Sequence, residues 1–334
     1  MQLLNDKFGD MMRDMIIEAV RNHFGDVPTK VIQDELSKLL KVSPATVYNK
    51  LSGRNDFSNE EFLLIAGTYN ISVDNIIFRN NRDCYHFFTD SRNTKPRDFE
   101  EYLLILMQNV NQAGADKDSS IYFICLQPHI FHLMKYPYLL YTKLYTFNLI
   151  NWKNQQMMQF DPGKFIQSEN YRHLTQRLYQ AYACLPATEI LNQHFIHPLC
   201  SQIEYLIDSQ IIASQEDIHS IRKELYLLTD ELEQTAARGG REVSKHGFTP
   251  IDMFVNKFIH ISNIVLVQSA SKSFFTLQCE VPDVLKTTDF VFISHFTEWL
   301  EKNQEYAVPI SKTGGLERKR FFNGMRRQID ETFH

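Results

Sequence analysis

The chain has 334 residues, of which 43% are hydrophobic and 22% charged, and its formal net charge is −5 at pH 7. This length predicts about two domains, and the aromatic and aliphatic residues along it exclude a disordered protein. The five cysteines form no C-x-x-C pair, which argues against a disulfide framework or a zinc ribbon. The N-terminal segment carries three aspartates where a signal peptide would be basic, and no apolar run approaches the ~20 residues of a membrane helix. We therefore expect a cytoplasmic protein.

Basic residues are concentrated near the two ends of the chain. Residues 30–54 hold five basic and two acidic side chains, a local balance of +3, and residues 311–327 hold six and one, a balance of +5. This distribution is compatible with a small DNA-contacting face on a protein that otherwise repels nucleic acid.

The first 54 residues predict three helices. Apolar residues at spacings of three and four indicate a helix over 11–24, and a second helix follows from Val31 to Leu40. Ser43 is a good N-cap, Pro44 suits the first helical position, and Gly53 supplies a left-handed stop. Residues 31–54 therefore predict two short helices around a tight turn, the helix-turn-helix unit that places its second helix, Pro44–Leu51, in the major groove of DNA.

Two further helices complete a five-helix N-terminal domain. Ser58 and Glu61 have the spacing of a capping box, which predicts a helix from there through Tyr69. Ser72 caps a short last helix that ends near Phe78. We place the helix-turn-helix domain at residues 1–79 and a polar linker at residues 80–97.

The recognition helix and its surroundings resemble a known family. Ala45-Thr46-Val47-Tyr48-Asn49-Lys50-Leu51-Ser52-Gly53 is similar to the Cro/repressor-type (XRE-like) helix-turn-helix bacterial transcriptional regulators. The closer likeness is to a subgroup with a Tyr-Arg-Arg-Ile-x-Gly-like recognition helix and a long helical C-terminal domain. Looser matches are Phe131–Pro137, Leu185–Ile190 and Arg320–Asn323. The resemblance implies a transcription regulator that binds DNA as a dimer. Because Asn49 and Lys50 replace two basic residues of that signature, the family's DNA preference does not carry over.

Helix geometry selects the residues that would contact DNA. With Val47 and Leu51 facing the core, Asn49 and Ala45 point most nearly the opposite way. Asn49 is the candidate for base readout, because a carboxamide pairs bidentately with adenine, and Ala45 could pack on a thymine methyl. The other predicted contacts position the helix, mainly on phosphates. The predicted DNA-binding set is Ser43, Ala45, Thr46, Tyr48, Asn49, Lys50, Ser52 and Arg54.

Residues 98–334 predict a larger all-helical domain for dimerisation or effector binding, as a bundle or irregular solenoid with one or two short strands. The segment IYFICL at residues 121–126 suits either a strand or a buried helical turn. The expected helices include 99–110, 137–152, 251–268, 290–300 and one after Gly314-Gly315. The whole chain is thus expected to be mainly α. The last helix has a basic face that could touch DNA flanks, although a solvated charged face is the commoner explanation.

Two features of this domain raise ligand hypotheses. Residues 121–152 hold nine aromatic side chains, which favour a packed core over an aromatic-lined pocket. The pairs His129/His132 and His194/His197 invite a metal hypothesis. Neither pair has an acidic or cysteine partner at a fixed spacing, so we expect no metal and no cofactor.

No sequence motif of nucleophilic, nucleotide-dependent or zinc-dependent catalysis is present, so we do not expect an enzyme. The leading hypothesis is a transcription regulator whose partners are double-stranded DNA, a second copy of the chain and an unidentified effector. The alternative is a helical protein-interaction scaffold that carries a helix-turn-helix fold without binding DNA. A third hypothesis, an enzyme fused to a DNA-binding module, has no residue in its favour.

Overall fold

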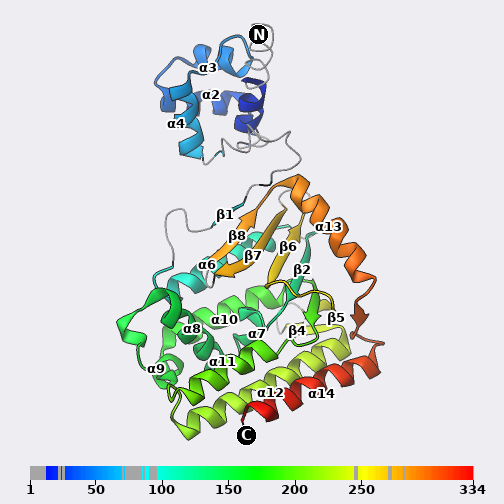
Figure 1. Ribbon diagram of the computed structural model, residues 1–334. Helices are drawn as coiled ribbons and strands as arrows, with labels where there is room; N and C mark the ends of the chain where they lie inside the picture. The colour runs from blue at the N-terminus through cyan, green and yellow to red at the C-terminus, as the bar shows by residue number, and fades with distance from the viewer. Residues whose placement is uncertain are drawn as a thin grey trace, which may run out of the picture. The chain divides into compact units, whose positions relative to one another are not determined.

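The computed structural model describes residues 13–21, 24, 27–69, 71, 85, 87–89, 96–116, 118–243, 247–269, 273–280 and 283–333. The chain divides into two compact units, residues 1–86 and 87–334, which are drawn in Figure 1. The short helix expected before Phe78 and most of the expected linker lie outside the described residues. Strand β1 (Phe88–Thr89) falls within the linker range but pairs with the sheet of the second unit.

The first unit is helical in its described part. Residues 13–21 are helical, and α2 (Thr29–Leu40), α3 (Pro44–Leu51) and α4 (Asn59–Tyr69) follow. Their buried side chains meet in one small core of Val20, Ile32, Leu36, Val47, Leu51 and Ile65. The helices predicted over 31–40, 44–51 and 58–69 are confirmed.

Local signals in the sequence define both ends of α3 and the start of α4. The Ser43 hydroxyl accepts a hydrogen bond from the Thr46 N–H (3.1 Å) at the start of α3, and Gly53 has φ +75° after its end. Before α4, the Glu61 carboxylate accepts from the Ser58 N–H (2.7 Å) and the Ser58 hydroxyl accepts from the Glu61 N–H (3.2 Å). This is the predicted capping box.

The second unit is an α/β structure, so the expectation of an all-helical domain and a mainly α chain was wrong. Its described residues form a nine-stranded mixed sheet in the order β1-β8-β7-β6-β2-β3-β5-β4, with β9 also pairing with β5. Strands β2, β3 and β5 are parallel, and the remaining pairs are antiparallel. The strands after β1 are β2 (Ser120–Cys125), β3 (Ala187–Asn192), β4 (Gly240–Val243), β5 (Gly247–Asn256), β6 (Ile264–Gln268), β7 (Phe274–Glu280), β8 (Asp283–Thr287) and β9 (Val308–Pro309).

Helices cover both faces of this sheet unequally. Helix α13 (Phe290–Gln304) packs on one face, and the other described helices pack on the opposite face (Figure 1). These are α6 (Phe99–Ala113), α7 (Ile130–Leu133), α8 (Pro137–Phe147), α9 (Pro162–Gln167), α10 (Glu169–Ala183), α11 (His197–Asp208), α12 (Gln215–Arg238) and α14 (Gly315–Thr332). A π-helical turn, Asn148–Trp152, extends α8, and Gln155–Met157 forms a 3₁₀ turn.

The expected helix over 251–268 is two strands, β5 and β6. In β5, Ile251, Met253 and Val255 are buried on one face and alternate with more exposed residues, which is the period of a strand. The helix prediction took Phe254, Val255, Phe258, Ile261 and Val265 as its inward face. Their helix-like spacing arises by coincidence, because Val255 belongs to β5 and Val265 to β6. Strand β3 was missed because it is short and buried on both faces, so its sequence does not alternate.

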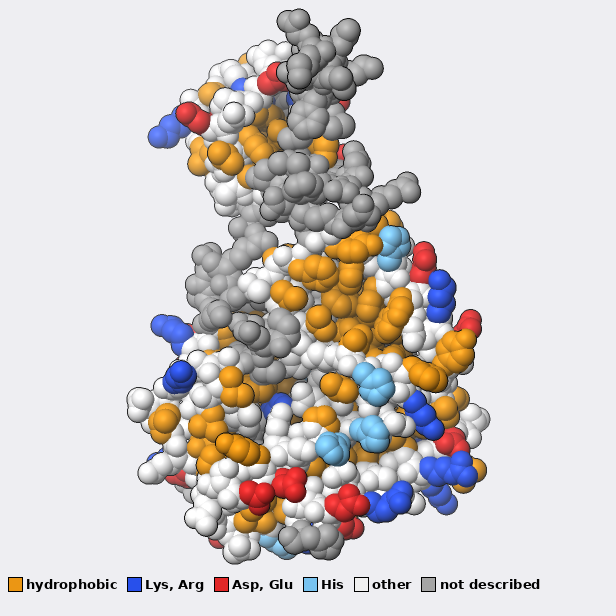
Figure 2. All heavy atoms as spheres, in the orientation of Figure 1, with side chains coloured by type: hydrophobic (Ala, Val, Ile, Leu, Met, Phe, Trp, Pro, Cys, Tyr) orange, Lys and Arg blue, Asp and Glu red, His pale blue; other side chains and the backbone are white. Residues whose placement is uncertain are grey.

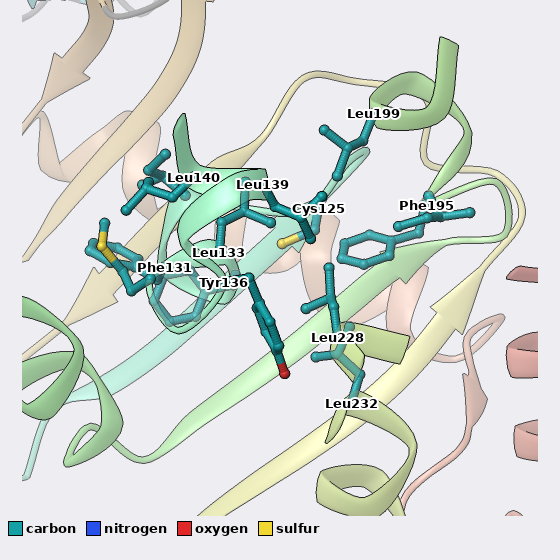
Figure 3. Packing of buried hydrophobic residues seen from close by; sticks show 14 of the residues in the cluster. Cys125, Phe131, Leu133, Tyr136, Leu139, Leu140, Phe195, Leu199, Leu228 and Leu232 are labelled. Atoms are coloured by element: carbon teal, nitrogen blue, oxygen red, sulfur yellow. The ribbon is translucent and has the colours of Figure 1, made fainter. Parts of the chain in front are cut away.

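The main core lies between the sheet and the larger group of helices. Figure 3 shows Cys125 of β2, Leu139 of α8, Phe195, Leu199 of α11 and Leu228 of α12 meeting there. Most aromatic side chains of residues 121–152 are buried in this core, including Tyr136, Tyr141, Tyr145 and Phe147.

The face beneath α13 has a smaller core. It contains Ile124, Ile190 and Phe275 from the sheet and Ile293 and Leu300 from α13. Figure 2 shows hydrophobic side chains gathered on the second unit around α13 and the neighbouring strands. Within the described ranges, every helix is too short or too polar to cross a membrane.

Helix α14, expected after Gly314-Gly315, packs against α12 and α11, and its buried residues include Phe322, Met325 and Ile329. On its outer side, Lys319 and Arg327 are exposed. Arg326 donates to Asp230 of α12 (2.7 Å) and to Glu233 of α12 (2.5 Å), so this arginine of the basic segment belongs to the helix–helix contact.

Candidate functional site

Helix α3 presents an exposed stripe on the side away from the core. Val47 and Leu51 are buried, whereas Ala45, Tyr48 and Ser52 are exposed and Asn49 is half-buried. Positions 45, 48, 49 and 52 are spaced by three and four residues and therefore share one helix face. We call Ala45, Tyr48, Asn49 and Ser52 the α3 stripe. Its direction agrees with the one predicted from helix geometry.

The Asn49 side chain is a polar group of the stripe that can both donate and accept further hydrogen bonds. Its carboxamide makes no hydrogen bond within the described residues, although its main-chain carbonyl accepts from the Arg54 N–H (2.9 Å). Next to it, the Arg54 guanidinium lies 5.8 Å from the centre of the Tyr48 ring. A free carboxamide flanked by an aromatic hydroxyl and a cation can pair with a base edge and with phosphate.

The three small hydroxyl residues of the predicted set are all committed to local structure. Ser43 caps α3, and its hydroxyl also lies 2.9 Å from the Thr46 hydroxyl. Ser52 donates to the Asn49 carbonyl (3.1 Å). A hydroxyl has two lone pairs and one proton, so each could still accept or share a bond at the surface.

Lys50 differs from the role that the sequence predicted for it. Only 9% of the residue is exposed, and its ammonium donates to the Glu61 carboxylate (2.7 Å) and to the Asp56 carbonyl (2.6 Å). Burial opposes ionisation of Glu61, but hydrogen bonds from Lys50 and the Ser58 N–H outweigh it and lower the pKa of Glu61. Lys50 ties the end of α3 to the start of α4, and this placement removes it from the surface beside the α3 stripe.

Positive charge nevertheless remains around the stripe. Between residues 30 and 54, Lys30, Lys38, Lys41 and Arg54 are exposed, against exposed Asp34 and Glu35. The local balance of exposed groups is therefore +2 instead of the +3 of the sequence. Of these four basic residues, Lys41 is nearest in sequence to the start of α3, and it lies in the turn with a left-handed φ of 55°.

The second unit contains a buried ionic cluster that was not predicted from the sequence. Glu189 of β3 is 1% exposed, and its two carboxylate oxygens contact His132 Nε2 (3.2 Å) and the Arg241 guanidinium (3.1 Å). The Tyr182 hydroxyl donates to Glu189 (3.0 Å), and Arg241 also lies over the Tyr182 ring at 4.3 Å. We call these four residues the Glu189 cluster.

The electrostatics of the Glu189 cluster keep its carboxylate charged. Burial alone would raise the pKa of Glu189, but His132, Arg241 and the Tyr182 hydroxyl reverse the effect and lower it to about 2. Burial also raises the pKa of Tyr182 well above its usual value, so that side chain stays a neutral donor. The charged groups pair with one another, although the buried Arg241 Nε has no hydrogen-bond partner among the described residues. The arrangement is that of a structural ion pair joining β3 to α10 and β4. In the sequence, the only sign of this cluster was an acidic residue next to the apolar residues of β3.

The predicted histidine pairs lie in different environments. His129 and His132 are adjacent, with the His129 N–H donating to His132 Nδ1 (3.1 Å), whereas His194 and His197 are exposed. In the part of the chain that the structure describes, no three His, Cys, Asp or Glu side chains come together as a possible metal site. No protein-family model, curated protein or solved structure matched the chain.

Proposed function

We propose that the protein is a sequence-selective DNA-binding regulator of transcription that inserts α3 into the major groove. The observation that carries the proposal is the α3 stripe, an exposed face with an uncommitted carboxamide on a helix held firmly at both ends. The major groove is about 12 Å wide and admits one α-helix. The resemblance of residues 45–53 to the Cro/repressor-type regulators supports the same placement.

The residues of the stripe divide into two roles in this proposal. Asn49 reads adenine through N6 and N7, and the Ala45 methyl group packs against a thymine methyl. Tyr48 and Arg54 contact phosphates on either side and fix the position of the helix without reading sequence, with Ser43, Thr46 and Ser52 as weaker contacts. Lys50 acts indirectly by holding α3 against α4.

One helix of this kind reads only a few base pairs, so we propose that two copies of the chain act together. A two-fold dimer would present two α3 helices to half-sites ~34 Å apart, one turn of the duplex. The selected sequence would then be a palindrome.

Selection of duplexes from a randomised library at two salt concentrations tests the proposal. We expect an enriched palindromic site and an affinity that falls steeply with salt, because phosphate contacts release counterions. A protein-interaction scaffold would enrich no sequence, and that result would contradict DNA recognition.

A pair of asparagine variants tests the assigned base contact. We expect Asn49→Ala to lose ~1–3 kcal/mol of discrimination at one base pair of the selected site, because the bidentate contact is gone. Asn59→Ala, the same change at an exposed position of α4, serves as the control and should leave the site unchanged. If Asn49→Ala selects the same site with the same affinity, Asn49 does not read a base.

A further inference from the structure

The second unit contains a cavity of about 100 Å³ between α6 and the sheet, partly open to solvent. Leu106 and Val110 of α6 form one wall, and Phe123, Val265 and Phe274 of the sheet form the opposite one. For comparison, an apolar protein cavity of ~150 Å³ stays dry and binds benzene. The space is therefore suited to a small organic molecule with an apolar body.

The floor of the cavity is set by strand register. Phe123 of β2 lies opposite Val265 of β6, which lies opposite Thr276 of β7, so the three side chains form a row on one face. The row continues to Lys286 of β8, whose ammonium lies 3.4 Å from Asn109 Oδ1 and 4.8 Å from the centre of the Phe274 ring. The side chains of the floor are thus held in position by strands whose backbones are hydrogen-bonded to one another.

Asn263 places a hydrogen-bond donor at this apolar space. It is 4% exposed, and its Oδ1 accepts from the N–H groups of Leu126 (2.9 Å) and Gln127 (3.2 Å), which fixes the orientation of the amide. Its Nδ2 donates to no described residue. Asn263 lines the cavity and its Nδ2 is not among the fully buried atoms, so a ligand or solvent molecule in the cavity can accept from it.

His129 supplies a second donor. Its Nδ1 accepts a long hydrogen bond from the Phe131 N–H (3.5 Å), and its ring stacks on Phe131 at 4.7 Å. Burial and the neighbouring His132 lower the pKa of His129 to about 3, so the ring is neutral and its proton lies on Nε2. Nε2 has no acceptor within the described residues, and the residue lines the cavity.

We propose that this cavity is a binding site for a small uncharged molecule with a compact apolar body and one carbonyl-type oxygen. The apolar walls take the body, and the Asn263 amide and His129 Nε2 donate to the oxygen. An anionic group would be desolvated beside a neutral imidazole and a neutral amide, and the Lys286 side chain is not part of the cavity lining. This site does not depend on the proposed binding of DNA.

Two probes of matched shape test the proposal on the full chain. Cyclopentanone carries the carbonyl oxygen, and methylenecyclopentane replaces it by a CH₂ group that accepts no hydrogen bond. Titrations are followed through the ¹³C-labelled methyl groups of Leu106, Val110, Ile121 and Val265. We expect saturable shifts at these methyls and ~5–25-fold tighter binding of the ketone, because each of its two hydrogen bonds contributes about five-fold.

Two leucine variants of α6 locate the bound probe. Leu106→Phe fills the cavity and should weaken cyclopentanone at least ten-fold, whereas Leu104→Phe adds the same ring at a position 48% exposed and should bind like the wild type. The comparison of the two probes on the wild-type chain needs neither variant to fold. Absence of saturable shifts, equal affinity for both probes, or cyclopentanone affinity unchanged by Leu106→Phe would each overturn the proposal.

Discussion

Two buried charges show how a single side chain can be tied to distant parts of the fold. Lys50 reaches Glu61 on the next helix, eleven residues away, and Glu189 reaches His132 and Arg241 across separations of 57 and 52 residues. Removing one partner from such a pair leaves the other buried without compensation. In both places the charge holds secondary structure elements together, although Lys50 was predicted from its helix position to contact DNA.

The pH dependence of stability tests the Glu189 cluster. The pKa of Glu189 is about 2 in the folded protein against a usual value of 4.5, so its contribution is fully present above pH 4.5 and is lost as the pH falls through 2. We expect Glu189→Gln to cost ~3–5 kcal/mol at neutral pH, because Arg241 stays buried without its counter-ion, and to flatten the loss of stability below pH 5.

Tryptophan fluorescence during urea unfolding measures the stability lost in Glu189→Gln, because Trp152 and Trp299 both lie in the second unit. The control is Glu242→Gln, which changes a side chain 78% exposed on the neighbouring strand β4. Equal stability losses in the two variants at neutral pH would contradict a structural role for the cluster.

Among the elements, those with local start and stop signals could be predicted and those defined by distant pairing could not. Helices α2, α3, α4 and α12 each carry a cap, a glycine or a periodic face in their own sequence. Strand β3 owes its position to pairing with β2 and β5, which lie about 60 residues away on either side. The same limit applies to the sites, since the α3 stripe follows from one helix, whereas the cavity and the Glu189 cluster need the assembled sheet.

The capping of α3 can be tested at the level of the helix. Ser43→Ala removes the acceptor for the Thr46 N–H, and we expect a loss of ~1 kcal/mol in the stability of α3. Amide hydrogen exchange at Val47 and Tyr48 should then accelerate about five-fold. Thr68→Ala removes a hydroxyl from an exposed position of α4 and should leave these amides unchanged. Equal exchange rates in the Ser43→Ala variant and the wild type would show that the cap contributes nothing.

For the whole molecule, net charge works against nucleic-acid binding while local charge favours it. The chain carries −5, yet the exposed groups of residues 30–54 balance at +2. On the proposed function, Arg54→Ala should reduce the slope of log affinity against log salt by ~1 for each copy bound, because one phosphate contact is lost. Lys302→Ala removes the same exposed charge from α13 and should leave the slope unchanged. A slope that both variants lower equally would point to the overall charge instead of the α3 surface.

The pairing of β1 with β8 has a consequence for synthesis. Phe88 lies opposite Lys286 in the sheet, so the two strands are separated by 198 residues of chain. At roughly 5–20 residues per second, a ribosome needs about 10–40 s to add the later strand after the earlier one. Residues 1–86 have by then left the ribosome and had time to fold, while β1 still lacks its partner. Addition of β1 to the sheet is therefore expected to be a late event in the formation of the protein.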